Sequence, residues 1–228
     1  SRQRMRICPI PAIAALLGVA LVVLAAPRLT AGLVTAPFDD TVRALGRGEP
    51  LSDEALRLAL GSRIRATGWV GDGQYFADAA ALQFAVYENG PQTRGRLDTV
   101  IDAHRVALER APSQTFLWYR LALASLLRDG YGPAVGDALR MSLETGRHEA
   151  RLVMPRLALA LSVWAGLPAD VRSGFDGQIA LAMRWYAREL VTVTQRSYRL
   201  ATVRAALEPY SGLRDSFNLL YERRRGLR

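Results

Sequence analysis

The chain has 228 residues, of which half are apolar and 22% are charged, and this balance excludes an intrinsically disordered polypeptide. Its net charge is +9, and every basic residue is arginine, which indicates a GC-rich bacterial genome. The single cysteine, Cys8, excludes an intrachain disulfide, so packing must hold the fold together.

The first predicted element is an apolar segment, residues 7–27, that contains no charged side chain. As a helix it would be about 31 Å long, the thickness of a bilayer's hydrocarbon core. Its ten Leu, Ile and Val residues favour insertion by about 3 to 6 kcal/mol. The alternative is a cleaved secretory signal, but signal cores usually have only about 7 to 15 residues. We therefore expect a retained transmembrane helix, on which Ala14, Ala15 and Gly18 offer a small surface for packing against other spans.

The charges on either side of this segment predict its orientation. Arg2, Arg4 and Arg6 form a basic tail over residues 1–6, whereas Arg28 is the one arginine that closely follows the segment. Basic flanks stay in the cytoplasm. The sequence therefore predicts a bacterial inner-membrane protein with a cytoplasmic N-terminus and roughly 200 residues in the periplasm.

A connector over residues 28–50 contains one short helical pattern closed by glycines and Pro50. Beyond it, apolar side chains recur at three- and four-residue spacing, and Gly90-Pro91 stops one of these runs. Later runs cover residues 114–128, 132–144, 149–165, 169–194 and 197–208. No segment shows the sustained alternation of a strand. These patterns predict an all-α fold with one exported helical domain over residues 51–209, in which consecutive helices are antiparallel neighbours.

The end of the chain is predicted to be a basic tail over residues 210–228. Residues 184–228 hold ten arginines and four acidic residues, whereas the charges of residues 7–183 sum to zero. An exported domain meets little nucleic acid, so we expect no nucleic-acid partner. Arg223, Arg224 and Arg225 are candidate contacts to membrane lipids, an acidic glycan or an acidic protein, and a solvated helix face with a frayed end is the alternative.

Residues 107–138 carry small, proline and aromatic residues at a characteristic spacing: Ala107, Pro112, Trp118, Leu121, Ala122, Ala134 and Ala138. The proline ends one helix, the tryptophan begins the next, and the small residues allow two helices to approach closely. The pattern resembles a degenerate tetratricopeptide repeat (TPR), with Ser125 in place of the usual tyrosine and no register after Gly146. The resemblance covers roughly a quarter of the chain and implies a TPR-like solenoid of helical hairpins.

A second resemblance covers the stretch from Leu139 to Ile179, which is similar to membrane-anchored accessory proteins of bacterial exopolysaccharide biosynthesis. In that family an N-terminal span precedes a TPR-like exported domain. The matching positions are mostly packing residues. The resemblance therefore implies a role in the cell envelope and no catalytic residue.

Few side chains suit catalysis or metal binding. His104 lies on an apolar stripe with Ile101 and Leu108, so we expect a core or edge histidine rather than a base. His148 is followed by Leu152 at the position where a zinc-protease helix needs its second histidine. Asp98 and Asp102 have arginines 94, 96 and 105 nearby, which favours solvated ion pairs. The sequence predicts no enzyme activity, no metal and no cofactor.

The first helix of the TPR-like hairpin would present Phe116, Tyr119, Leu123 and Leu126 on one face. This face is more apolar than a peptide-binding groove usually is. We expect another helix of the same chain to cover it, and a large partner is the alternative.

These observations predict a non-catalytic, membrane-anchored scaffold or adaptor that docks other membrane or periplasmic proteins, and the second resemblance implies exopolysaccharide assembly. One alternative is a permanent accessory subunit of a large integral-membrane complex of respiratory or photosynthetic type. Another is a helical glycan-processing enzyme, for which Glu88, Glu144 and Glu149 are the candidate acids.

Overall fold

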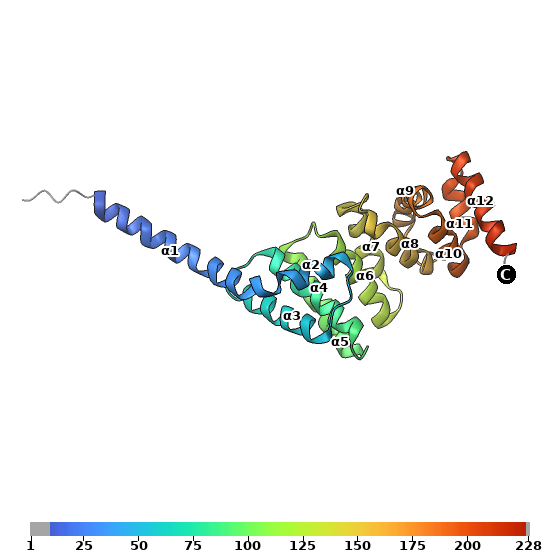
Figure 1. The fold of residues 1–228 in the computed structure, drawn as a ribbon. Helices are drawn as coiled ribbons and strands as arrows, with labels where there is room; N and C mark the ends of the chain where they lie inside the picture. The colour runs from blue at the N-terminus through green and yellow to red at the C-terminus, as the bar shows by residue number, and fades with distance from the viewer. Residues whose placement is uncertain (1–9, 227–228) are drawn as a thin grey trace, which may run out of the picture. The chain divides into compact units, whose positions relative to one another are not determined.

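The computed structural model describes residues 10–226, and in this range the chain is helical with no strand (Figure 1). Two compact units are present: the first ends at Gly90 and the second begins at Pro91. The boundary falls inside the segment predicted to be a single domain, residues 51–209. Gly90 has extended backbone dihedrals and Pro91 has no amide hydrogen, so the helix before them cannot continue.

The first unit consists of α1 (Ile10–Thr35), the 3₁₀ turn η1 (Ala36–Phe38), α2 (Asp39–Arg47), α3 (Asp53–Thr67) and α4 (Gly73–Asn89). Helix α1 extends beyond residue 27 because its last turns pack against α3, where Ala31 and Thr35 are buried. Together with η1 and α2, it makes most of the predicted connector helical. The core between α3 and α4 contains Leu56, Ala59, Leu82, Ala85 and Val86.

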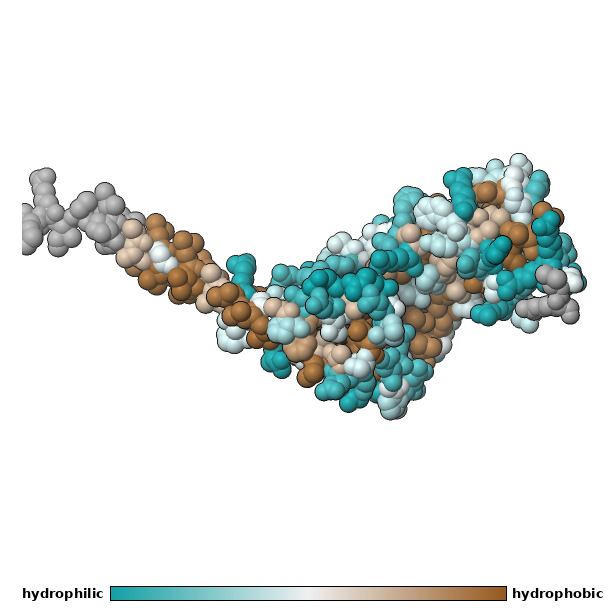
Figure 2. All heavy atoms as spheres, in the orientation of Figure 1, coloured by the Kyte–Doolittle hydropathy of each residue, from teal (hydrophilic) through white to brown (hydrophobic). Residues whose placement is uncertain are grey.

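Every side chain of α1 from Ala14 to Ala26 is exposed, and Figure 2 shows apolar atoms along this helix. By length and composition α1 is able to cross a membrane. The predicted basic tail, with Arg2, Arg4 and Arg6, and the start of the predicted span, residues 7–9 with Cys8, lie outside the described residues.

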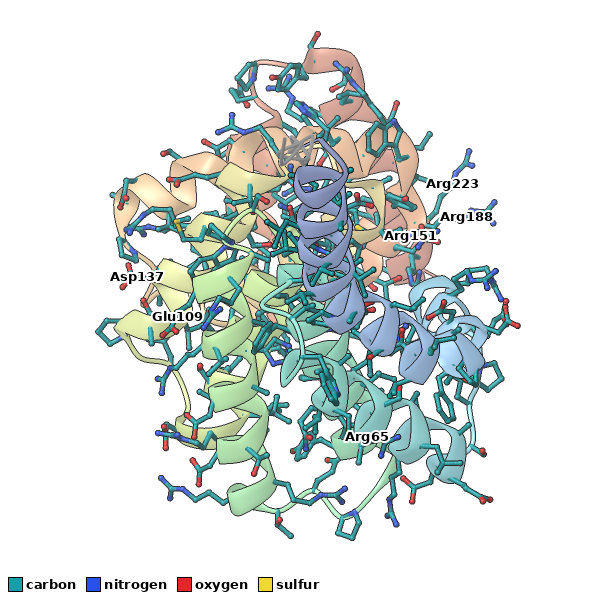
Figure 3. All side chains as sticks on the ribbon, turned by 90° about the vertical axis from the view of Figure 1, so that its left-hand side faces the viewer. Arg65, Glu109, Asp137, Arg151, Arg188 and Arg223 are labelled. Atoms are coloured by element: carbon teal, nitrogen blue, oxygen red, sulfur yellow. The ribbon has the colours of Figure 1, made fainter. Side chains whose placement is uncertain are left out.

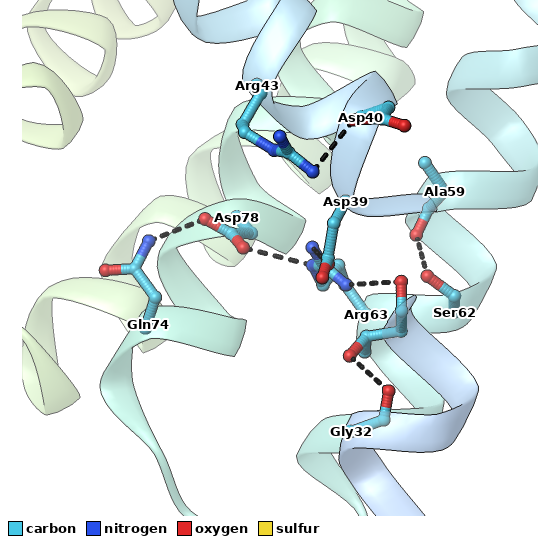
Figure 4. Close-up of polar contacts among 10 residues, drawn as sticks. Gly32, Asp39, Asp40, Arg43, Ala59, Ser62, Arg63, Gln74 and Asp78 are labelled. Carbon is cyan, nitrogen blue, oxygen red and sulfur yellow. Dashed lines mark hydrogen bonds and ion pairs between the residues drawn. The ribbon is translucent and has the colours of Figure 1, made fainter. Parts of the chain in front are cut away.

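One buried arginine connects the helices of the first unit (Figure 4). Arg63 of α3 is 3% exposed and donates hydrogen bonds to the Asp78 carboxylate at 3.0 Å, the Asp39 carboxylate at 2.7 Å and the Thr35 carbonyl oxygen at 3.3 Å. Gln74 donates to the other Asp78 oxygen at 2.7 Å. Burial raises the pKa of Asp78, and the bonds from Gln74 and Arg63 oppose that rise. This Arg63 clamp fixes the end of α1 and the start of α2 to α3 and α4.

The second unit consists of α5 (Arg94–Arg110), α6 (Thr115–Asp129), α7 (Pro133–Thr145), α8 (Ala150–Ser162), α9 (Ala169–Trp185), α10 (Ala187–Ser197), α11 (Leu200–Leu207) and α12 (Ser211–Gly226). Consecutive helices from α5 to α7 and from α8 to α12 pack against each other. Buried side chains from the seven helices α6 to α12 form the core, and they include Leu139, Leu157, Phe175, Ile179, Leu190 and Phe217.

The helix predicted over residues 169–194 is divided into α9 and α10 at Tyr186. Tyr186 leaves the helical conformation, with φ −141° and ψ 41°, and its hydroxyl donates to the Ala150 carbonyl oxygen at 3.2 Å. The change of direction allows α10 to pack against α8 as well as α9.

The segment predicted as a basic tail forms helix α12 up to Gly226. Phe217 is fully buried in the core of the second unit, and Leu213, Leu220 and Tyr221 pack against that core. These four residues occur at helical spacing, so one face of α12 packs on the core, while Arg223 and Arg225 are exposed.

Candidate functional site

A groove on the second unit lies between α10 and α12. The two helices contact each other, and Val191 is buried between them. The groove has a volume of about 340 Å³ and is lined by Arg188, Val191, Leu220, Arg223 and Arg224. We call these five residues the basic groove. Leu220, which is partly exposed, provides apolar contact surface, Val191 closes the floor of the groove from the core, and the three arginines supply the charge.

The arginines of the basic groove are available to a ligand. Among residues 10–226, none of the ion pairs involves Arg188, Arg223 or Arg224. The neighbouring acid Glu222 lies 3.8 Å from Arg204 instead. Figure 3 shows Arg188 and Arg223 pointing outward on the same side of the second unit. Guanidinium groups in this arrangement can bind carboxylates through paired N–H···O bonds.

Two of the three predicted arginine contacts, Arg223 and Arg224, line the basic groove, whereas Arg225 is exposed on α12 and does not line it. Sequence reasoning missed Arg188, Val191 and Leu220. The excess of arginine over residues 184–228 was a signal for a basic surface, but it could not indicate which turn of α10 faces α12.

The other predicted surfaces lie elsewhere in the chain. Phe116, Tyr119, Leu123 and Leu126 of α6 are half-buried, and the last three pack against the core of the second unit. Helices of the same chain therefore cover much of this face. Ala14, Ala15 and Gly18 are exposed on α1.

The described residues contain no cluster of three or more His, Cys, Asp or Glu side chains that could hold a metal. His104, predicted to be a core or edge histidine, is completely buried, and its Nδ1–H donates to the Val100 carbonyl oxygen at 2.8 Å. His148 is exposed.

Three of the acidic candidates, Asp98, Asp102 and Glu149, are engaged in ion pairs or a helix cap. Asp102 pairs with Arg105 at 3.6 Å, as expected, but Asp98 pairs with Arg128 of α6 at 2.7 Å rather than with an arginine of its own helix. Glu149 caps α8 by accepting from the Arg151 amide. Glu144 and Glu88 are exposed.

Burial of His104 predicts a loss of stability in acid. Burial lowers its pKa to about 4, whereas an unfolded histidine titrates near 6.5. The unfolded state therefore takes up a proton first, and as the pH falls from about 6.5 to 4 the unfolding free energy should drop by up to about 3 kcal/mol. The unfolding free energy measured with urea should fall less steeply with decreasing pH in His104→Leu than in the wild-type protein. An equal slope in both proteins would contradict the assignment.

Comparison with known proteins identifies no relative: no protein-family model, curated protein or solved structure matches this chain.

Proposed function

We propose that this chain is a single-span inner-membrane protein that presents a non-catalytic helical adaptor in the periplasm of a bacterium. In this proposal α1 is the anchor, the Arg63 clamp joins it to the first unit, and the basic groove docks a partner. The observation that carries the proposal is the groove itself, where three arginines without ion pairs surround apolar side chains.

The occupant that fits the groove best is an acidic, amphipathic segment of another envelope protein. Its carboxylates would pair with the arginines, and an apolar side chain would cover the partly exposed Leu220. An acidic glycan could supply the charge but would leave the exposed part of Leu220 without apolar contact. The resemblance of Leu139–Ile179 supports exopolysaccharide assembly as the pathway.

A TPR-like arrangement of α5 to α7 is part of the proposal. It is supported by Trp118, whose indole Nε1–H donates to the Pro112 carbonyl oxygen at 2.7 Å and so links two positions of the repeat pattern. Ala122 and Ala138 are buried, as close helix packing requires.

The permanent-subunit alternative is favoured by a different observation, the exposed small residues of α1. A side chain added at Gly18 would meet nothing within 4 Å, so another span could approach α1 closely there. Size separation after mild detergent extraction distinguishes the two functions. If the chain comigrates stoichiometrically with a large complex, both in the wild-type form and after replacement of the groove arginines, that result would support the permanent-subunit function.

Charge reversal in the groove tests the adaptor. The double variant Arg188→Glu with Arg223→Glu should weaken partner binding by about 10- to 100-fold, because it sets like charges against an acidic partner. The control, Arg105→Glu with Arg147→Glu, changes the net charge equally at exposed positions of the same unit. Copurification from native membranes in mild detergent measures the outcome. Equal recovery of partners with both variants would refute a role for the groove.

A further inference from the structure

A second pocket, in the first unit, lies beside α1 at the end of its uncharged run and is distinct from the basic groove. Its volume is about 550 Å³, and it is lined by Leu24, Pro27 and Arg28 of α1 and by Val70, Gly71, Asp72 and Tyr75 of the α3–α4 loop and the start of α4. We call it the α1 pocket. It therefore combines a cation, an anion, a phenol and apolar side chains.

The position of the α1 pocket along α1 indicates its surroundings. Arg28 is the first charged residue after the uncharged run of residues 7–27. If α1 spans the bilayer as proposed above, the pocket lies where hydrocarbon gives way to lipid headgroups. Trp69, in the same loop, is 55% exposed, and tryptophan is enriched at this depth of a membrane.

The two charged residues of the α1 pocket are not paired with each other. Asp72 caps α4 by accepting from the Gln74 amide at 2.8 Å, which leaves its second carboxylate oxygen open to another donor. Arg28 takes part in none of the ion pairs among the described residues. A ligand with a negative and a positive group would satisfy both residues.

We propose that the α1 pocket binds the headgroup of an aminophospholipid, a proposal that depends on the membrane anchoring proposed above. Arg28 binds the phosphate, Asp72 accepts a hydrogen bond from the primary ammonium, and Leu24 contacts the start of an acyl chain. A phosphatidylglycerol headgroup offers Asp72 no cation. A choline headgroup has a quaternary ammonium without an N–H, so it cannot donate to Asp72.

The test uses the full chain in nanodiscs of phosphatidylcholine that contain equal minor fractions of phosphatidylethanolamine and phosphatidylglycerol. Native mass spectrometry counts the lipids that stay bound after the protein is released from the nanodisc. Among the bound lipids, we expect the ratio of the ethanolamine lipid to either competitor to be about tenfold higher than the same ratio in the nanodisc. Asp72→Asn, which preserves the helix cap, should abolish that preference, and Arg28→Gln should reduce retention of all three lipids.

The matched controls are Asp40→Asn and Arg57→Gln, which are exposed in the same unit and line neither pocket. They should retain the wild-type preference. Equal retention of the three lipids by the wild-type chain, or an unchanged preference in Asp72→Asn, would overturn the lipid site. Failure of the wild-type chain to float with vesicles would instead overturn membrane anchoring and the lipid site together.

Discussion

Replacement of Arg63 with alanine is expected to destabilise the first unit by about 3 to 5 kcal/mol, because it leaves a buried carboxylate without its cation. The Asp78 side chain is only 13% exposed, so water cannot fully replace the lost guanidinium. The same change removes the donors to Asp39 and to the Thr35 carbonyl oxygen. The end of α1 should therefore loosen from α3.

Hydrogen exchange on the full chain in detergent measures both effects, since it reports each unit separately. Amides around η1 should exchange faster in Arg63→Ala, while those of the second unit should be unchanged. Arg57→Ala, which removes an exposed pair with Asp53, should cost less than about 1 kcal/mol. The double variant Arg63→Met with Asp78→Leu should recover most of the lost stability, because it removes both charges. A loss in the double variant as large as in Arg63→Ala would argue against the ion pair as the cause.

The second large effect is expected at Arg156, which is completely buried in the second unit. It donates to the carbonyl oxygens of Ser142 and Gly146 at 2.8 Å and of Leu152 at 3.2 Å. The first two belong to the C-terminal end of α7, where carbonyl groups have no partner within the helix. Burial lowers the Arg156 pKa to about 10, so the side chain remains charged at neutral pH. Its positive charge interacts favourably with the negative, C-terminal end of the α7 dipole.

Arg156→Ala should cost about 3 to 5 kcal/mol, since it leaves buried carbonyl oxygens unpaired and opens a cavity. Arg156→Lys should cost less, because one ammonium can replace some of the three bonds. The free energy of urea unfolding checks both values. The control is Arg147→Ala, an exposed arginine in the α7–α8 loop next to Gly146, which should change stability by about 0.5 kcal/mol or less. Equal effects at positions 147 and 156 would contradict the capping role.

These two arginines illustrate what sequence reasoning cannot supply. Arg63 and Arg156 lie among 30 arginines in a chain without lysine, and arginine is ordinarily expected at the surface. Their burial depends on carboxylates and carbonyl groups from other helices, such as Asp78 for Arg63 and Ser142 for Arg156. Only the packed structure brings these partners together.

The sequence predicts only part of the candidate site, because the residues of the basic groove come from two separate helices. Arg223 and Arg224 were identified from the charge of the C-terminal segment, but Arg188 lies more than 30 residues earlier. The apolar positions of α12, including Phe217, were obscured by the arginines around them, so the segment was predicted to be a tail. Its amphipathic pattern becomes decisive only when the core of the second unit is present to bury Phe217.

The amino-acid sequence alone determined the helical fold class, the apolar segment able to span a membrane and the place of His104 on an apolar stripe, because each depends on the spacing of residues within one helix. The tertiary structure decided the boundary at Gly90, the extension of α1 to Thr35, the break at Tyr186 and the basic groove. Each of these depends on which distant helix packs against a given turn, and the periodicity of a single helix carries no information about that partner.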